Sequence, residues 1–101
     1  MMVTKIEEIE NKFLVTLEGE MDTAAAEEAE EVLKPLYNSG GKDVIIDCSK
    51  LEYIASSGLR ILILILKGAK ACGSKVTLKH VNDDILNVLR LTGFTSIFNF
   101  E

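Results

Sequence analysis

A nearly continuous apolar run at residues 59–66 (LRILILIL) most constrains the fold of this chain, because only Arg60 interrupts it. By composition alone, such a run fits either a buried strand or a buried helix. The length of the segment favours a helix, since it continues to Gly73, and glycine commonly ends helices. A membrane span needs about twenty apolar residues. We therefore expect a buried helix over residues 57–72 and no insertion into a membrane.

Two serines, Ser56 and Ser57, precede the apolar run. A serine before an apolar run is typical of a helix N-cap, because its hydroxyl accepts an unpaired N–H group of the first turn. We expect Ser56 to lie on or beside the helix N-terminus, where oriented N–H groups and a partial positive charge favour anions. Ser56 is then either a plain cap or a functional serine.

One side of the predicted helix carries most of its polar residues. At about 100° per residue, Ser56, Arg60, Ile63, Lys67 and Lys70 fall together. Ile63 is the apolar member of this group. A lone surface isoleucine is common, whereas an apolar residue ringed by cations is also typical of a docking face. Both interpretations stay open at this point.

The whole chain sets further limits. Its 101 residues are enough for one packed domain, residues 1–101, and 48% hydrophobic content favours a folded chain. The net charge of −5 argues against nucleic acid as a partner. Cys48 and Cys72 have no metal-type spacing. No secretion signal or glycine-rich phosphate loop is recognisable, so we expect a cytoplasmic protein without a metal, cofactor or small-molecule ligand.

Apolar periodicity and turn residues predict the other elements. In chain order they are strands 2–8 and 12–20, a helix from residue 23 to near residue 34, strand 43–48, a connection 49–55, the helix 57–72, strand 75–80, helix 84–91 and an extended segment 94–100. The order β-β-α-β-α-β-α-β implies an α/β fold with a mixed, largely parallel sheet packed with helices. The continuous apolar strand 43–48 is expected to be buried on both faces.

The first predicted helix has a narrow apolar stripe. Asp22 or Thr23 is expected to cap it, and Pro35 is expected to end or kink it. Val32 lies in the apolar stripe, and Glu30 is expected to face water.

Four segments resemble the STAS domain, a family named for sulfate transporters and anti-sigma factor antagonists. Residues 19–22 (GEMD) resemble its G-x-(apolar)-D motif, and residues 44–47 (VIID) resemble the strand before its switch loop. Residues 53–59 (YIASSGL) are similar to its switch motif D-S-S-G-L or S-S-A-G-L, and residues 89–94 (LRLTGF) to its L-x-x-x-G-(apolar) ending. In this order and spacing, the segments identify nearly the whole chain as a STAS domain.

The resemblance implies a non-enzymatic, partner-switching regulator of transcription. In that scheme the unphosphorylated domain binds an anti-sigma factor, which is a serine kinase, and so releases the sigma factor. The kinase uses ATP to phosphorylate the switch serine, which maps to Ser56 or, failing that, to Ser57, and a metal-dependent serine phosphatase reverses the step. The residues expected to bind the partner are Asp22, Ala55, Ser56, Ser57, Gly58, Arg60, Ile63 and Lys67.

One position departs from the family pattern. Many antagonists have aspartate directly before the switch serine, where this chain has Ala55. A carboxylate there could orient the serine hydroxyl or the partner. A docking role without phosphorylation is therefore the alternative, as in STAS domains that are accessory subunits of lipid-transporting ABC systems.

A serine hydrolase is the competing enzymatic interpretation. Ser56 precedes a helix, but residues 54–58 (IASSG) lack the first glycine of the G-x-S-x-G motif. His80 is the single histidine of the chain, and no oxyanion motif accompanies it. We therefore expect no catalytic activity.

Overall fold

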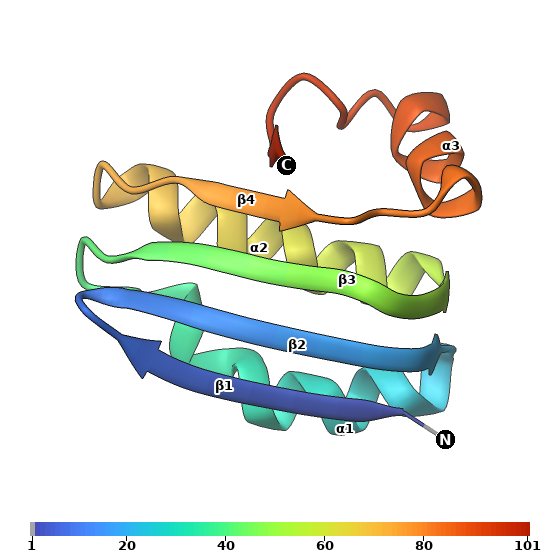
Figure 1. Cartoon of the computed structure of the whole chain (residues 1–101), viewed down its shortest axis with the longest axis horizontal. Coiled ribbons are helices and arrows are strands. Elements are labelled where there is room, and N and C mark those ends of the chain that lie inside the picture. Colours follow the sequence, from blue (N-terminus) through green and yellow to red (C-terminus); the bar gives the residue numbers. More distant parts are fainter. Residues whose placement is uncertain (1) are drawn as a thin grey trace.

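The computed structural model describes residues 2–101 (Figure 1). Its elements in chain order are β1 (Val3–Ile9), β2 (Lys12–Met21), α1 (Thr23–Leu33), the 3₁₀ turn η1 (Lys34–Tyr37), β3 (Asp43–Ile54), α2 (Ser56–Ala71), β4 (Val76–Lys79), α3 (Asp83–Leu91) and β5 (Asn99–Phe100). The predicted order β-β-α-β-α-β-α-β is confirmed.

Within these residues the five strands form one sheet in the order β1-β2-β3-β4-β5. β1 pairs antiparallel with β2, and the other neighbouring strands pair in parallel. The predicted mixed, largely parallel sheet is therefore confirmed. Figure 1 shows α1 and α2 behind the sheet, while α3 lies beyond the carboxyl end of β4.

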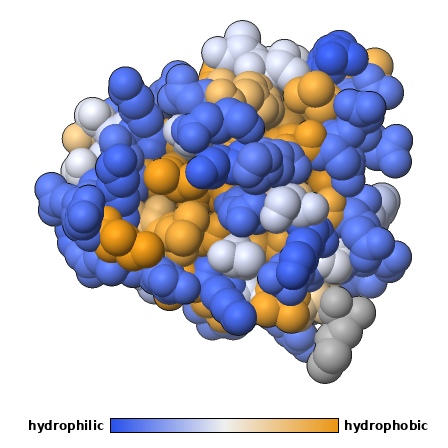
Figure 2. Space-filling model, in the orientation of Figure 1, coloured by the Kyte–Doolittle hydropathy of each residue, from blue (hydrophilic) through white to orange (hydrophobic). Residues whose placement is uncertain are grey.

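The core lies between the sheet and the two helices that cover it. Val15 of β2 and Val44 and Ile46 of β3 are fully buried on the covered face. Leu14 and Ile45, which are paired neighbours on the opposite face, are only half-buried. The prediction that β3 is buried on both faces is wrong, because α1 and α2 cover only one of them. On the open face, hydrophilic residues surround smaller apolar patches (Figure 2).

β3 is longer than predicted, because the expected connection at residues 49–55 continues the strand to Ile54. Its polar side chains hide the strand pattern in the sequence, but its backbone keeps pairing with β2 through two register shifts. At the first irregularity, the Asp47 carboxylate accepts a hydrogen bond from the Ser49 N–H at 2.9 Å. The longer strand carries the chain to the N-terminus of α2.

α1 is capped as predicted, since Asp22 Oδ1 accepts the Ala25 N–H at 2.9 Å. The helix ends at Leu33, directly before η1, because Pro35 cannot continue the α-helical hydrogen bonds. The predicted apolar stripe is partly wrong: Ala26 faces the core, and Val32 is 42% exposed.

η1 packs closely on α2 at Gly68. A Cβ atom at Gly68 would lie 1.9 Å from the Tyr37 carbonyl oxygen, so the contact requires glycine. The two segments are therefore joined backbone against backbone.

In the C-terminal part, helix α3 forms as predicted, but the last segment differs from its prediction. Asn82 caps α3 and also donates a hydrogen bond from Nδ2 to the Leu51 carbonyl at 3.0 Å, which ties α3 to β3. Of the predicted extended segment 94–100, only Asn99–Phe100 forms a strand, because Phe98 turns into the core and the residues around it form turns.

Candidate functional site

The predicted switch segment lies at the carboxyl edge of the sheet, where β2 and β3 end and α2 begins (Figure 1, right). Ala55 is the single residue between β3 and α2. Its N–H donates to the Met21 carbonyl at 2.8 Å, and its carbonyl accepts the first helical bond from the Leu59 N–H at 2.9 Å. The ends of both strands thus hold the start of α2 in place.

The two adjacent serines have different surroundings. Ser56 is exposed and is the first residue of α2. Ser57 is half-buried, and within residues 2–101 its Oγ is buried without a hydrogen-bond partner. A modifying enzyme could reach Ser56 more easily than Ser57.

Ser56 lies at the N-terminus of α2 as expected, but the alternative that it is a plain helix cap is wrong. The N-cap position belongs to Ala55, whose methyl group cannot accept a hydrogen bond, and Ser56 already lies inside the helix. The hydroxyl of Ser56 is therefore not needed to start the helix.

Gly58 sits beneath the serines and is buried. A Cβ atom there would approach Met21 Sδ to 2.5 Å and Ile54 Cγ1 to 2.9 Å. Glycine lets the first turn of α2 pack against the ends of β2 and β3, so Gly58 positions the switch segment.

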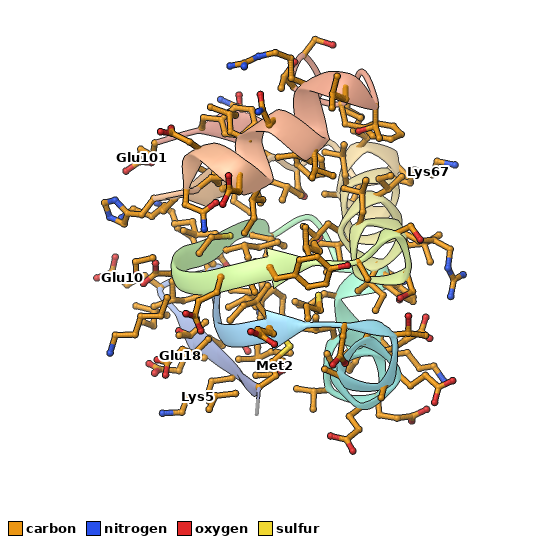
Figure 3. All side chains as sticks on the ribbon, turned by 90° about the vertical axis from the view of Figure 1, so that its right-hand side faces the viewer. Met2, Lys5, Glu10, Glu18, Lys67 and Glu101 are labelled. Atoms are coloured by element: carbon orange, nitrogen blue, oxygen red, sulfur yellow. The ribbon has the colours of Figure 1, made fainter. Side chains whose placement is uncertain are left out.

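The polar side of α2 is arranged largely as predicted. Arg60, Lys67 and Lys70 are exposed, and Lys67 points away from the sheet in Figure 3. Ile63 is half-buried and packs against the core, so it is not a bare surface residue. The exposed serine and the cations share one face with a partly accessible apolar residue.

An interaction that the sequence pattern does not reveal joins α1, η1 and α2. Tyr37 donates its hydroxyl to Glu30 Oε2 at 2.7 Å, and the Arg60 guanidinium lies 3.7 Å from the same oxygen. The side chain of Glu30 is only 24% exposed, so the expectation that it faces water is wrong. Burial and the Glu30 carboxylate raise the pKa of Tyr37 to about 12.

Asp22 lies close to the switch segment through the backbone. Met21 pairs with Ile54 across β2 and β3, and the Met21 carbonyl accepts the Ala55 N–H. A hollow of about 350 Å³ beside Asp22 is lined by Met2, Glu20, Asp22, Ala24, Ala25 and Glu28. Asp22 is exposed at this edge, in addition to capping α1.

A profile of known families matches this chain over residues 2–101 and is described as the STAS domain. The chain belongs to the STAS domain family. The predicted family membership is thus confirmed over all the residues that the structure describes.

Proteins similar in sequence to this STAS domain are named as anti-sigma factor antagonists. The anti-sigma-B factor antagonist of Staphylococcus aureus is 28% identical over 85 residues, which are 84% of this chain and 79% of the relative. BtrV of Bordetella bronchiseptica, provisionally assigned as an anti-sigma factor antagonist, is 29% identical over 97 residues, 96% of this chain and 84% of the relative.

Solved structures share the fold of this STAS domain. An anti-sigma factor antagonist of Mycobacterium paratuberculosis has a TM-score of 0.80 at 24% identity, covering 99% of this chain and 85% of the other. Phosphorylated SpoIIAA of Bacillus has a TM-score of 0.76 at 17% identity, covering 98% and 91%.

The family of this STAS domain is non-catalytic, and the prediction that the chain is not an enzyme is confirmed by that membership. The structure does not assemble the hydrolase constellation either. His80 is exposed at the end of β4, where its backbone N–H bonds to the Glu101 carbonyl, and no hydrogen bond joins its side chain to Ser56 or Ser57 in residues 2–101.

The described part of the chain lacks two other features, a metal-binding cluster and a membrane-spanning helix. Residues 2–101 contain no cluster of three histidine, cysteine or carboxylate side chains placed to hold a metal ion. None of their helices combines the length and the apolar character needed to cross a membrane.

Proposed function

We propose that this STAS domain is an anti-sigma factor antagonist controlled by phosphorylation of Ser56. Unphosphorylated, it binds an anti-sigma factor that is also a serine kinase, and the sigma factor is released. The kinase then phosphorylates Ser56 with ATP, and a metal-dependent serine phosphatase reverses the modification. The observation that carries the proposal is the exposed Ser56 at the first position of α2. We place this exchange in the cytoplasm, where bacterial transcription takes place.

The proposed docking surface surrounds the start of α2. Its accessible side chains are Asp22, Ser56, Arg60 and Lys67, while Ala55, Ser57 and Ile63 are half-buried and Gly58 is buried beneath them. Gly58 therefore acts by positioning the first turn of α2 rather than by touching the partner.

We propose that Tyr53 extends this surface, although the family motif does not mark it as a contact. It lies near the carboxyl end of β3, is 52% exposed, and is two residues before Ala55. Exposed tyrosines are enriched among the residues that dominate binding energy at interfaces. We assign Tyr53 the role of an aromatic anchor.

The energies support a switch that acts on binding. A phosphate adds about −1.5 to −2 charges, and at a helix N-terminus this charge stabilises by roughly 0.3–1 kcal/mol. If the same group were buried unpaired in the interface, it would weaken the binding free energy by roughly several kcal/mol. Because about 1.4 kcal/mol corresponds to a tenfold change in affinity, phosphorylation should weaken docking by at least about a hundredfold.

The test is intact mass spectrometry of the protein isolated from its native cells, with the modified residue mapped by fragmentation. We expect a phosphate on Ser56 in part of the population, and a serine kinase bound only to the unmodified part. Ser56→Ala should remove the modification, and the matched variant Ser57→Ala should keep it.

Other results would contradict the proposal. Phosphate on Ser57 would move the switch by one residue. A chain that stays unmodified in growth and stress, and that is isolated with subunits of an ABC transporter, would replace the proposal with the docking role.

A further inference from the structure

Ser56 and Arg60 lie four residues apart on α2. At this spacing two side chains are neighbours on the helix surface, with their Cβ atoms about 5–6 Å apart. The long arginine side chain can therefore reach a group attached to the hydroxyl of Ser56. Arginine also matches phosphate well, because its planar guanidinium can donate two parallel hydrogen bonds.

In the unmodified protein Arg60 is held only weakly. Its guanidinium lies 3.7 Å from Glu30 Oε2, beyond the length of a good hydrogen bond, and its side chain is 63% exposed. Exposed ion pairs of this kind contribute little to stability. Arg60 can therefore leave Glu30 without disturbing the core.

Glu30 is the better-held member of the pair. Its side chain is 24% exposed, and its Oε2 accepts the Tyr37 hydroxyl at 2.7 Å. This carboxylate keeps one hydrogen bond when Arg60 departs, so the exchange leaves no buried charge without a partner.

We propose that Arg60 is an internal latch, which pairs with Glu30 while Ser56 is unmodified and with the phosphate once Ser56 is phosphorylated. This inference rests on the proposed function, because it concerns the same serine. Arg60 then has two mutually exclusive partners, Glu30 of α1 and the phosphate on Ser56 in the first turn of α2.

The latch would make phosphorylation act twice on the docking surface. The phosphate adds bulk and negative charge at Ser56, and the ion pair takes the guanidinium of Arg60 away from contacts with the partner. Lys67 is a further 7 residues along α2, about two turns from Arg60, and keeps its charge available.

The test uses protein with phosphoserine installed at position 56 during synthesis, so that no kinase is needed. The second ionisation of the phosphate, near pH 6 for free phosphoserine, is followed by ³¹P nuclear magnetic resonance. We expect Arg60→Gln to raise this pKa by roughly 0.3 units, because a neighbouring cation favours the dianion. The matched variant Lys67→Gln removes the same charge from the same helix and should change the phosphate pKa by less than a third as much.

A double-variant cycle tests the exchange with Glu30. Glu30→Gln should lower the phosphate pKa by releasing Arg60, and this effect should shrink in the Glu30→Gln/Arg60→Gln double variant. Equal phosphate pKa values in Arg60→Gln and Lys67→Gln would overturn the latch. So would an effect of Glu30→Gln that is unchanged in the double variant.

The titration separates this inference from the proposed function. A latch seen in the installed phosphoprotein stands even if native cells never modify Ser56. Conversely, Ser56 could be phosphorylated in cells while the phosphate pKa does not change in Arg60→Gln. That result would support the switch and overturn the latch.

Discussion

Ser56 and Ser57 form a pair in the sequence but not in their surroundings. Ser56 is exposed, whereas the Oγ of Ser57 is buried in the first turn of α2. A hydroxyl held away from solvent cannot be presented to a kinase without rearranging that turn. The exposure of each hydroxyl therefore distinguishes the two candidate phosphorylation sites more clearly than the sequence motif does.

Tyr37 provides a prediction at the scale of one residue. Tyr37→Phe should lower the free energy of unfolding at pH 7 by about 0.5–1.5 kcal/mol, because it removes the hydrogen bond to Glu30. Urea denaturation of the variant and the wild type measures this difference. Tyr53→Phe, at an exposed tyrosine, is the matched control and should change stability much less.

The same variant carries a prediction for alkaline pH. The pKa of Tyr37 is raised from 10.0 to about 12 in the fold. Its contribution is thus complete below pH 10 and is lost as the pH rises through 12, since the folded state holds the proton more tightly. Burial also raises the pKa of the Cys48 thiol to about 12, from 9.0. The stability that this protonated thiol contributes is therefore lost in the same way as the pH rises above 9. Stability should fall less steeply between pH 10 and 12 in Tyr37→Phe than in the wild type, and equal slopes would contradict the role of Tyr37.

At the scale of elements, helix α2 begins differently from α1 and α3. α1 and α3 are capped by the side chains of Asp22 and Asn82. α2 begins at Ala55, which has the same extended backbone, with φ −81° and ψ 167°, but no side-chain acceptor. The helix that carries the proposed switch serine therefore starts with more unpaired N–H groups than α1 and α3.

This difference predicts a stabilising substitution. Ala55→Asp should raise the free energy of unfolding by about 0.5–2 kcal/mol, because a carboxylate at this N-cap can accept an N–H bond of α2. Chemical denaturation measures the change, and Asp22→Ala should shift the stability by a similar amount in the opposite direction. An unchanged or lower stability of Ala55→Asp would show that the first turn of α2 is already satisfied.

At the scale of the whole molecule, the proposed switch lies outside the core. The sheet and the buried sides of α1 and α2 form one apolar cluster, and Ser56 is not part of it. A charge added at the surface of this cluster meets water and the N–H groups of α2. Phosphorylation of Ser56 should therefore leave the packing energy of the core unchanged.

This separation predicts that phosphorylation leaves the fold intact. Protein with phosphoserine at position 56 should have the far-ultraviolet circular dichroism spectrum of the unmodified chain, and an unfolding free energy equal to it or higher by up to about 1 kcal/mol. A clearly altered spectrum, or a loss of cooperative unfolding, would mean that phosphorylation acts by disrupting the domain.

Local sequence patterns were sufficient to predict much of the structure of this protein. The apolar periodicity of β2, the Asp22 cap and the apolar run of α2 report neighbours within a few residues, and the structure agrees with them. The order of these elements predicted the mixed sheet, because parallel strands need helical crossovers. The four motif segments were enough to recognise the family.

Other features depended on contacts between distant segments. β3 extends to Ile54 because β2 supplies backbone partners beyond its first shift in register, although the side chains there look like those of a loop. Glu30 turns inward because Tyr37 and Arg60 meet it from η1 and α2. The sequence alone determined which elements form and where the two candidate switch serines lie, since both follow from local periodicity and short motifs. Only the tertiary structure decided which serine is exposed and what Arg60 contacts, because these depend on the packing of segments that are far apart along the chain.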